Sequence, residues 1–173
     1  MGNAKKTAGK TVEIPESRTV NVCGVISDMM YGKRTYNNGR KDKEDKFRLS
    51  LKLADGQMEK FAEIAAPYYA NADETYIPKF LKEDAEEEDL EYLNFKSSYS
   101  WNFVQRTEEG EFEELGDFNT VLEKYGNING SKVVMTVKLK DGAFYPVGCC
   151  IVELKQKSLT EFYNDMDFDE LPF

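Results

Sequence analysis

The sequence predicts one mainly β domain, built as a small closed sheet, and three observations favour this fold class. Several short segments alternate apolar and polar residues with the two-residue period of a β-strand. Glycine turns such as Asn38-Gly39 and Asp141-Gly142 stand between these segments, as tight hairpins require. Of the 173 residues, 40% are hydrophobic and 13% are aromatic, which is enough for a single core.

The first half of the chain is predicted to hold three strands. Residues 18–31 form the first, and Gly24 within it indicates a bend or bulge of the kind that closed sheets use. Residues 46–53 form the second, because Phe and Leu alternate there with mostly basic side chains. A turn at Asp55-Gly56 then leads into a third strand at about residues 57–65.

The second half is predicted to begin with an insert, around residues 67–115. Seven of the nine residues in 83–91 are acidic, which predicts a solvated helix or a mobile loop. Strand-like alternation occurs at four later places, and these are residues 93–104, 112–115, 131–140 and 145–154.

A short helix is predicted between the insert and the last two strands. Asp117 can cap its N-terminus and Gly126 can end it. The apolar residues between them fall on one helical face: Phe118, Val121, Leu122 and Tyr125. The order of three strands, one helix and two strands is that of the OB fold, a five-stranded Greek-key barrel. Another small antiparallel barrel or a sandwich is the alternative.

The chain therefore divides into three predicted parts. Residues 1–16 form a flexible arm, residues 17–156 the OB-fold domain with its insert, and residues 157–173 a disordered acidic tail. No apolar run is long enough to cross a bilayer, and residues 1–6 lack the apolar stretch of a signal peptide. We expect a cytoplasmic protein without a membrane partner.

The composition excludes common catalytic chemistry. The chain contains no histidine, which removes Ser-His and Cys-His nucleophile systems and a frequent zinc ligand. The cysteines are Cys23, Cys149 and Cys150, and neighbouring residues of a strand point to opposite faces. We therefore expect small buried thiols, no disulfide, no metal, no cofactor and no enzyme activity.

A basic segment occupies residues 31–52, where the net charge is +5 although the whole chain carries −9. In an OB fold this segment forms the first loop and the second strand, on the face that binds nucleic acids. Cations pair with phosphates, and aromatic rings stack on unpaired bases. The residues expected to bind single-stranded DNA are Tyr31, Lys33, Arg34, Tyr36, Arg40, Lys41, Lys46, Arg48 and Lys52. A solvated basic hairpin that binds nothing is the alternative.

Three aromatic residues form a second candidate: Tyr99, Trp101 and Phe103. Their spacing of two places them on one face of a strand. That face either belongs to the core or forms an exposed platform on which bases stack, and the spacing alone fits both.

The tail carries five acidic residues and no basic residue from Glu161 onward. It also carries apolar residues that a purely solvating tail does not need, and this combination is typical of a docking peptide. We define residues 165–173 as the C-terminal tip. The docking residues expected within it are Asp165, Asp167, Phe168, Asp169, Glu170, Leu171, Pro172 and Phe173.

The tip reads Asp-Phe-Asp-Glu-Leu-Pro-Phe from Asp167 to Phe173. It resembles the C-terminal tip of bacterial and phage single-stranded-DNA-binding proteins, in which acidic residues precede Leu-Pro-Phe or Ile-Pro-Phe. The body resembles the compact phage-encoded members, because the chain has no long Gly/Gln/Pro-rich linker. The acidic run in 83–91 is foreign to the bacterial members.

This resemblance implies a protein that coats single-stranded DNA without strong sequence preference during replication, recombination or repair. The tip would recruit partner proteins of those processes, and the chain would be a monomer or a homodimer. Opposite charges also suggest that the tip competes with DNA for the basic segment. The alternative function is an acidic interaction protein, such as a DNA mimic that inhibits a nucleic-acid enzyme.

Overall fold

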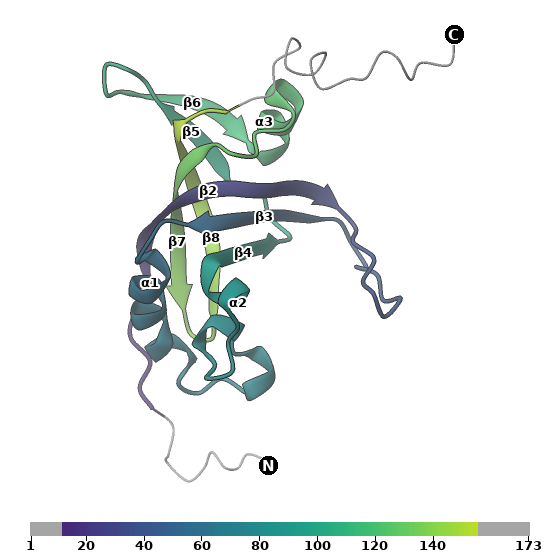
Figure 1. Cartoon of the computed structure of the whole chain (residues 1–173), viewed down its shortest axis with the longest axis vertical. Helices are drawn as coiled ribbons and strands as arrows, with labels where there is room; N and C mark the ends of the chain where they lie inside the picture. Colours follow the sequence, from purple (N-terminus) through teal and green to yellow (C-terminus); the bar gives the residue numbers. More distant parts are fainter. Residues whose placement is uncertain (1–11, 156–173) are drawn as a thin grey trace.

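The computed structural model describes residues 12–155, which form one seven-stranded mixed sheet with helices at its margins (Figure 1). The strand order is β4-β3-β2-β7-β8-β5-β6. The strands are β2 (Arg18–Gly32), β3 (Lys46–Leu53), β4 (Tyr92–Ser97), β5 (Asn102–Arg106), β6 (Phe112–Asp117), β7 (Lys132–Lys140) and β8 (Ala143–Glu153). The α-helices are α1 (Gln57–Ala65), α2 (Glu87–Glu91) and α3 (Phe118–Tyr125). Short 3₁₀ turns, η1 to η3, lie at Ala66–Tyr69, Glu74–Tyr76 and Lys79–Leu81.

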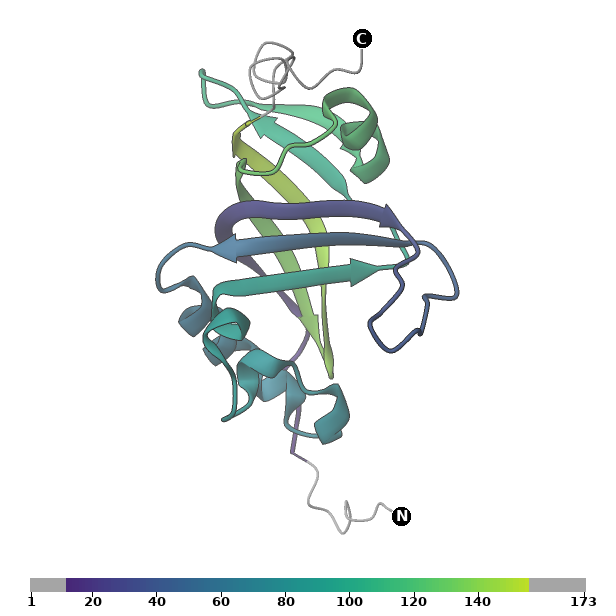
Figure 2. The ribbon, with the colours of Figure 1, turned by 45° about the vertical axis from the view of Figure 1, so that its right-hand side comes forward.

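The long strand β2 joins the two halves of the sheet. Its first part pairs with β7 and its second part with β3, and both pairings are antiparallel. At Gly24, a Cβ atom would lie 2.4 Å from the carbonyl oxygen of Lys52, so only glycine lets the two backbones come this close. The register shift of the predicted bulge lies just beyond, between Ile26 and Asp28. Figures 1 and 2 show β2 curving from the direction of β7 into that of β3.

Strand β8 joins the other side of the sheet, because it pairs antiparallel with β7 and parallel with β5. The single strand predicted at 93–104 is in fact two strands, β4 and β5, with a bend at residues 98–101. Strands β4, β5 and β6 belong to the same sheet as the others, so it has seven strands where five were expected for the barrel and two segments for the insert.

The strand predicted at residues 57–65 is wrong, because these residues form helix α1. Its buried residues are Met58, Phe61 and Ala65, which recur with helical rather than strand spacing. The preceding Gly56 has φ of +78°, and here that conformation begins a helix instead of closing a hairpin. The described residues contain three α-helices, whereas the sequence predicted α3 and, as one of two alternatives, a helix in 83–91.

The acidic run in 83–91 is helical only at its end, where α2 covers Glu87–Glu91. A capping box starts this helix, with the backbone N–H of Glu86 donating to the Asp89 side chain at 3.0 Å. Of the two predicted alternatives, helix and loop, the run contains both.

The helix predicted after Asp117 is confirmed as α3, and Gly126 ends it. The Asp117 carboxylate accepts a hydrogen bond from the Thr120 N–H at 3.0 Å, as an N-cap does. Phe118, the first residue of the helix, is fully buried and lies edge-on to Phe47, Trp101 and Phe103. This aromatic cluster fixes α3 against the sheet.

The three thiols are free, but they differ in exposure. Cys149 is buried, and the lost hydration raises the pKa of its thiol. Cys23 is exposed, so the expectation of buried thiols is wrong for this residue. None of the helices in residues 12–155 is long and apolar enough to span a membrane.

Candidate nucleic-acid interface

The loop between β2 and β3, residues 33–45, is attached to the outer face of the sheet through Asp42. The Asp42 carboxylate accepts hydrogen bonds from the Arg34 backbone N–H and the Tyr36 hydroxyl, both at 3.0 Å. It also pairs with the Arg48 guanidinium from β3 and lies 3.5 Å from the Lys96 ammonium from β4. One side chain thus connects the loop to two strands.

The Asp42–Arg48 pair is largely withdrawn from solvent. Its side chains are 6% and 10% exposed, and the Nε atom of Arg48 has no hydrogen-bond partner among the described residues. The N–H of Arg34, followed by the side chains of Arg48 and Tyr36, holds the pKa of Asp42 well below its usual range. Arg48 was predicted to bind phosphate, but it is occupied by Asp42 and positions the loop instead.

The substitution Asp42→Asn is expected to lower the melting temperature at neutral pH, because Arg48 loses its ionic partner. Since the native pKa of Asp42 is depressed, the stability from its charge is present above pH of about 4 and is lost below that. The difference between wild type and variant should therefore shrink as the pH falls from 7 to 3, as thermal denaturation would show. A constant difference would contradict this, and Asp84→Asn, in an exposed 3.8 Å pair with Lys79, is the control.

Most other cations of the loop remain exposed. These are Lys33, Arg34, Arg40, Lys41 and Lys43. The Arg40 guanidinium lies over the Tyr36 ring, 4.9 Å from its centre, and the Lys96 ammonium lies 5.8 Å from the same centre. The phenol ring therefore joins a loop cation to a cation of β4.

The other predicted residues of the segment lie in different surroundings. Tyr31 is half-exposed and packs against Phe47, with ring centres 4.4 Å apart. Lys46 bonds to Glu44 at 2.8 Å and to Ser98, so its charge is partly compensated. Lys52 is exposed but lies at the opposite end of β3, about 20 Å along the strand from Lys46. The structure does not bring Lys52 together with the loop.

A hollow of about 930 Å³ lies beside the bend between β4 and β5 and against the start of β8. Lys96, Tyr99, Lys140 and Tyr145 are among the residues that line it. Tyr99 is 82% exposed, and the Lys140 ammonium lies 5.8 Å from the centre of the Tyr145 ring. The hollow thus offers two cations and two accessible phenol rings.

The wall of this hollow also includes Trp101, whose indole N–H is buried and has no hydrogen-bond partner among residues 12–155. A buried donor without an acceptor is costly, so this N–H is a point of strain in the wall of the hollow. Asp117 lines the hollow too, but its carboxylate is engaged at the start of α3.

Trp101 and Phe103 do not form an exposed stacking platform, because they are 4% and 0% exposed. Both pack against Phe118 in the core. Tyr99 precedes β5 and lies in the bend, so the two-residue alternation does not extend to it. Of the three predicted aromatic residues, Tyr99 alone is free to stack on a base.

We call one set of residues the cationic track, because each contacts another member, is its neighbour in the sequence, or lines the same hollow. It comprises Tyr36, Arg40, Lys41, Lys96, Tyr99, Lys140 and Tyr145. Sequence reasoning missed Lys96, Lys140 and Tyr145 as binding residues. Lys96 stands opposite Arg48 in the β3–β4 register. The sequence predicts residues 57–65 as the strand next to β3, and so it does not reveal that β4 and Lys96 lie there.

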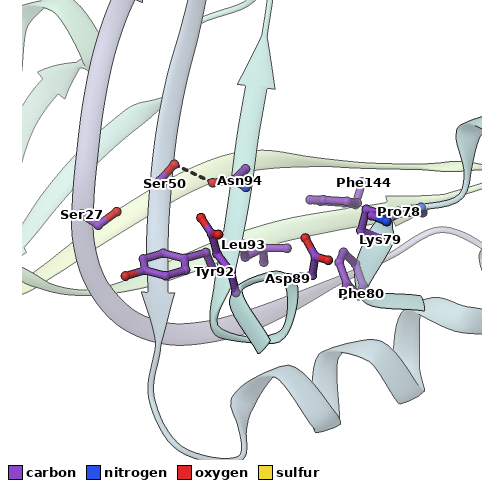
Figure 3. Close-up of a pocket in the computed structure, with 11 residues that line it drawn as sticks. Ser27, Ser50, Pro78, Lys79, Phe80, Asp89, Tyr92, Leu93, Asn94 and Phe144 are labelled. Atoms are coloured by element: carbon purple, nitrogen blue, oxygen red, sulfur yellow. Dashed lines mark hydrogen bonds between the residues drawn. The ribbon is translucent and has the colours of Figure 1, made fainter. Parts of the chain in front are cut away.

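A second hollow, of about 870 Å³, adjoins the track on the outer face of β3 and β4 (Figure 3). Asn94, two residues before Lys96, accepts from Ser50 at 2.5 Å in its floor. Figure 3 places Asp89 and Phe80, from the insert, facing this floor. Asp89 and Glu88 give the hollow an acidic rim, which would repel phosphates. The cationic track therefore ends at this acidic rim.

The predicted docking residues of the C-terminal tip lie outside the described residues. Among residues 12–155, no three His, Cys, Asp or Glu side chains gather in a way that could hold a metal ion. No family model matches the sequence, and neither the curated proteins nor the solved structures contain a significant match. The case for a function therefore rests on the geometry and on the sequence itself.

Proposed function

We propose that this protein binds single-stranded DNA along the cationic track and recruits partner proteins through its C-terminal tip. The observation that carries the proposal is the hollow that is lined by Lys96, Lys140, Tyr99 and Tyr145. Ammonium groups bind phosphates and accessible rings stack on bases, so this set matches both parts of an unpaired strand.

We also propose that the sheet is an OB-fold barrel with an enlarged insert. Three features support this interpretation: β2 pairs with both β3 and β7, β5 runs parallel to β8, and α3 precedes the last two strands. In such a barrel the loop 33–45 and the second strand lie on the usual nucleic-acid-binding face. The cationic track begins on that loop.

Single strands are favoured over duplex because the track depends on stacking. Bases in a duplex are already stacked and would not reach Tyr99. Stacking on an aromatic side chain contributes about 1–3 kcal/mol per base and depends little on base identity. We therefore expect binding without strong sequence preference.

The first test is a titration with oligo-dT, with an equal-length duplex as the comparison. Trp101 is the sole tryptophan and lines the hollow, so its fluorescence reports occupancy. Tyr99→Ala is expected to weaken oligo-dT binding by about 5-fold to 150-fold, the equivalent of one lost stacking contact. Tyr76→Ala is a matched control, because Tyr76 is 72% exposed but lies in η2, outside the cationic track. Equal losses in both variants would count against the track.

An acidic interaction protein is the second candidate, and the acidic rim of the insert favours it. Such a protein would use residues 83–91 and the tip as its binding surfaces. The two functions separate in the same titration. If neither oligo-dT nor duplex binds at low salt, DNA binding is refuted and the second candidate remains.

A further inference from the structure

A third hollow, of about 490 Å³, lies on the outside of the sheet where β2, β7 and β8 run side by side. Its walls include Cys23, Val25, Val134 and Val152. Val152 is 46% exposed, and Cys23 is exposed as well. An exposed apolar hollow of this kind is a typical place for another apolar segment to bind.

The apolar character is local to this part of the sheet. Cys23 pairs with Val134 across β2 and β7, whereas two residues earlier Asn21 pairs with Thr136 on the same outer face. Those two polar side chains bond to each other at 2.7 Å. The outer face therefore changes from polar to apolar at the hollow. A sheet face that only meets solvent is normally polar, so the apolar patch indicates a surface that another segment covers.

The rim of the hollow carries two lysines, Lys52 and Lys132, and the Lys132 ammonium also lies 3.5 Å from the Glu153 carboxylate. The described chain leaves the sheet beside this rim. The Lys155 backbone N–H donates to the Ser131 hydroxyl at 2.8 Å, and Ser131 is the neighbour of Lys132 in the sequence. Whatever follows Lys155 thus starts next to the hollow.

We propose that the protein's own C-terminal tip occupies this hollow. Eighteen residues follow Lys155, and ten of them reach Asp165, a span of up to about 35 Å when extended. The tip supplies what the hollow lacks, namely apolar side chains for its floor and carboxylates for its basic rim. The apolar residues concerned are Met166, Phe168 and Leu171.

This inference is independent of DNA binding. The hollow includes Lys52, at the end of β3 that is remote from the loop 33–45 and the cationic track. It also differs from competition between the tip and DNA for the basic segment, because here the tip is stored away from that segment. A tip bound in the hollow must be released before a partner can bind it.

The test uses the exposed thiol of Cys23 as a reporter in the full chain. Alkylation with N-ethylmaleimide is followed over time, and tryptic peptides separate Cys23 from Cys149 and Cys150. If the tip covers the hollow about nine-tenths of the time, Cys23 is accessible in about one molecule in ten. Replacing Met166, Phe168 and Leu171 with Ser should uncover it and so speed Cys23 alkylation about tenfold. Cys149, which is buried, should stay unlabelled and so report that the fold is intact.

Phe112→Ser is the matched control, because Phe112 is exposed on β6, away from the hollow. It should leave the Cys23 rate unchanged. Equal Cys23 rates with and without the apolar tip residues would overturn the inference. The inference would also be overturned if the Cys23 alkylation rate fell as the protein concentration rose and the protein sedimented as a dimer. A second copy of the chain would then cover the hollow. In either case the oligo-dT titration would be unaffected.

Discussion

Neutralising three cations of the track together, by Arg40→Gln, Lys41→Gln and Lys96→Gln, is expected to weaken oligo-dT binding on the order of 100-fold at low salt. All three reach solvent, although the Lys96 ammonium also lies 3.5 Å from the Asp42 carboxylate. Each phosphate contact on a single strand contributes about 0.7 to the slope of log affinity against log salt. The slope should therefore become shallower by about 2, which fluorescence titrations at several salt concentrations would measure.

The matched control removes the same charge elsewhere, through Lys60→Gln, Lys82→Gln and Lys124→Gln. These residues lie in α1, after η3 and in α3, outside the cationic track. The control should lower affinity only slightly, by a long-range effect that salt screens. If the two triple variants lose affinity equally, net charge rather than the track determines binding.

The substitution Phe118→Ala is expected to cost about 3–5 kcal/mol in the free energy of unfolding, the usual range for a buried Phe. The ring is fully buried and lies edge-on to Phe47 at 5.3 Å and Trp101 at 5.0 Å between ring centres. Its removal leaves a cavity between α3 and the sheet. Urea denaturation followed by circular dichroism would measure the loss.

Phe112→Ala is the control for this prediction, because the Phe112 ring is 65% exposed and should cost little. The Phe118→Ala substitution should also affect oligo-dT binding. Trp101 lines the hollow of the track and also packs on Phe118, so the cavity should weaken oligo-dT binding as well. A loss of less than 1 kcal/mol would mean that the aromatic cluster repacks around the gap.

The elements that the sequence predicts well are those in which a single signal dominates. Helix α3 has an N-cap, a one-sided apolar face and a terminal glycine, and β7 and β8 alternate around a glycine turn. Residues 57–65 carry conflicting signals, since an Asp-Gly turn precedes a segment whose buried residues follow helical spacing. Giving the turn priority over the spacing produced the error, and it also concealed β4 as the neighbour of β3.

The candidate binding site was predictable only as a region. Charge counting finds the basic loop, but it cannot tell a free cation from one already paired. Arg48 and Arg40 look alike in the sequence, yet Arg48 is buried against Asp42 and Arg40 is exposed over Tyr36. Likewise, Lys140 and Tyr145 meet Lys96 and Tyr99 only because β8 lies against the β4–β5 bend. Such long-range proximity is a property of the fold.

The anchoring of the loop 33–45 through Asp42 has a kinetic consequence. Arg48, Lys96 and Tyr36 already hold the loop on the sheet, so under the proposed function a DNA strand would meet a preorganised surface and lose little free energy to ordering it. Association then does not wait for the loop to fold and can approach the rate set by diffusion and charge. Differences in affinity between DNA sequences or between loop variants should accordingly appear mainly in how long each complex survives.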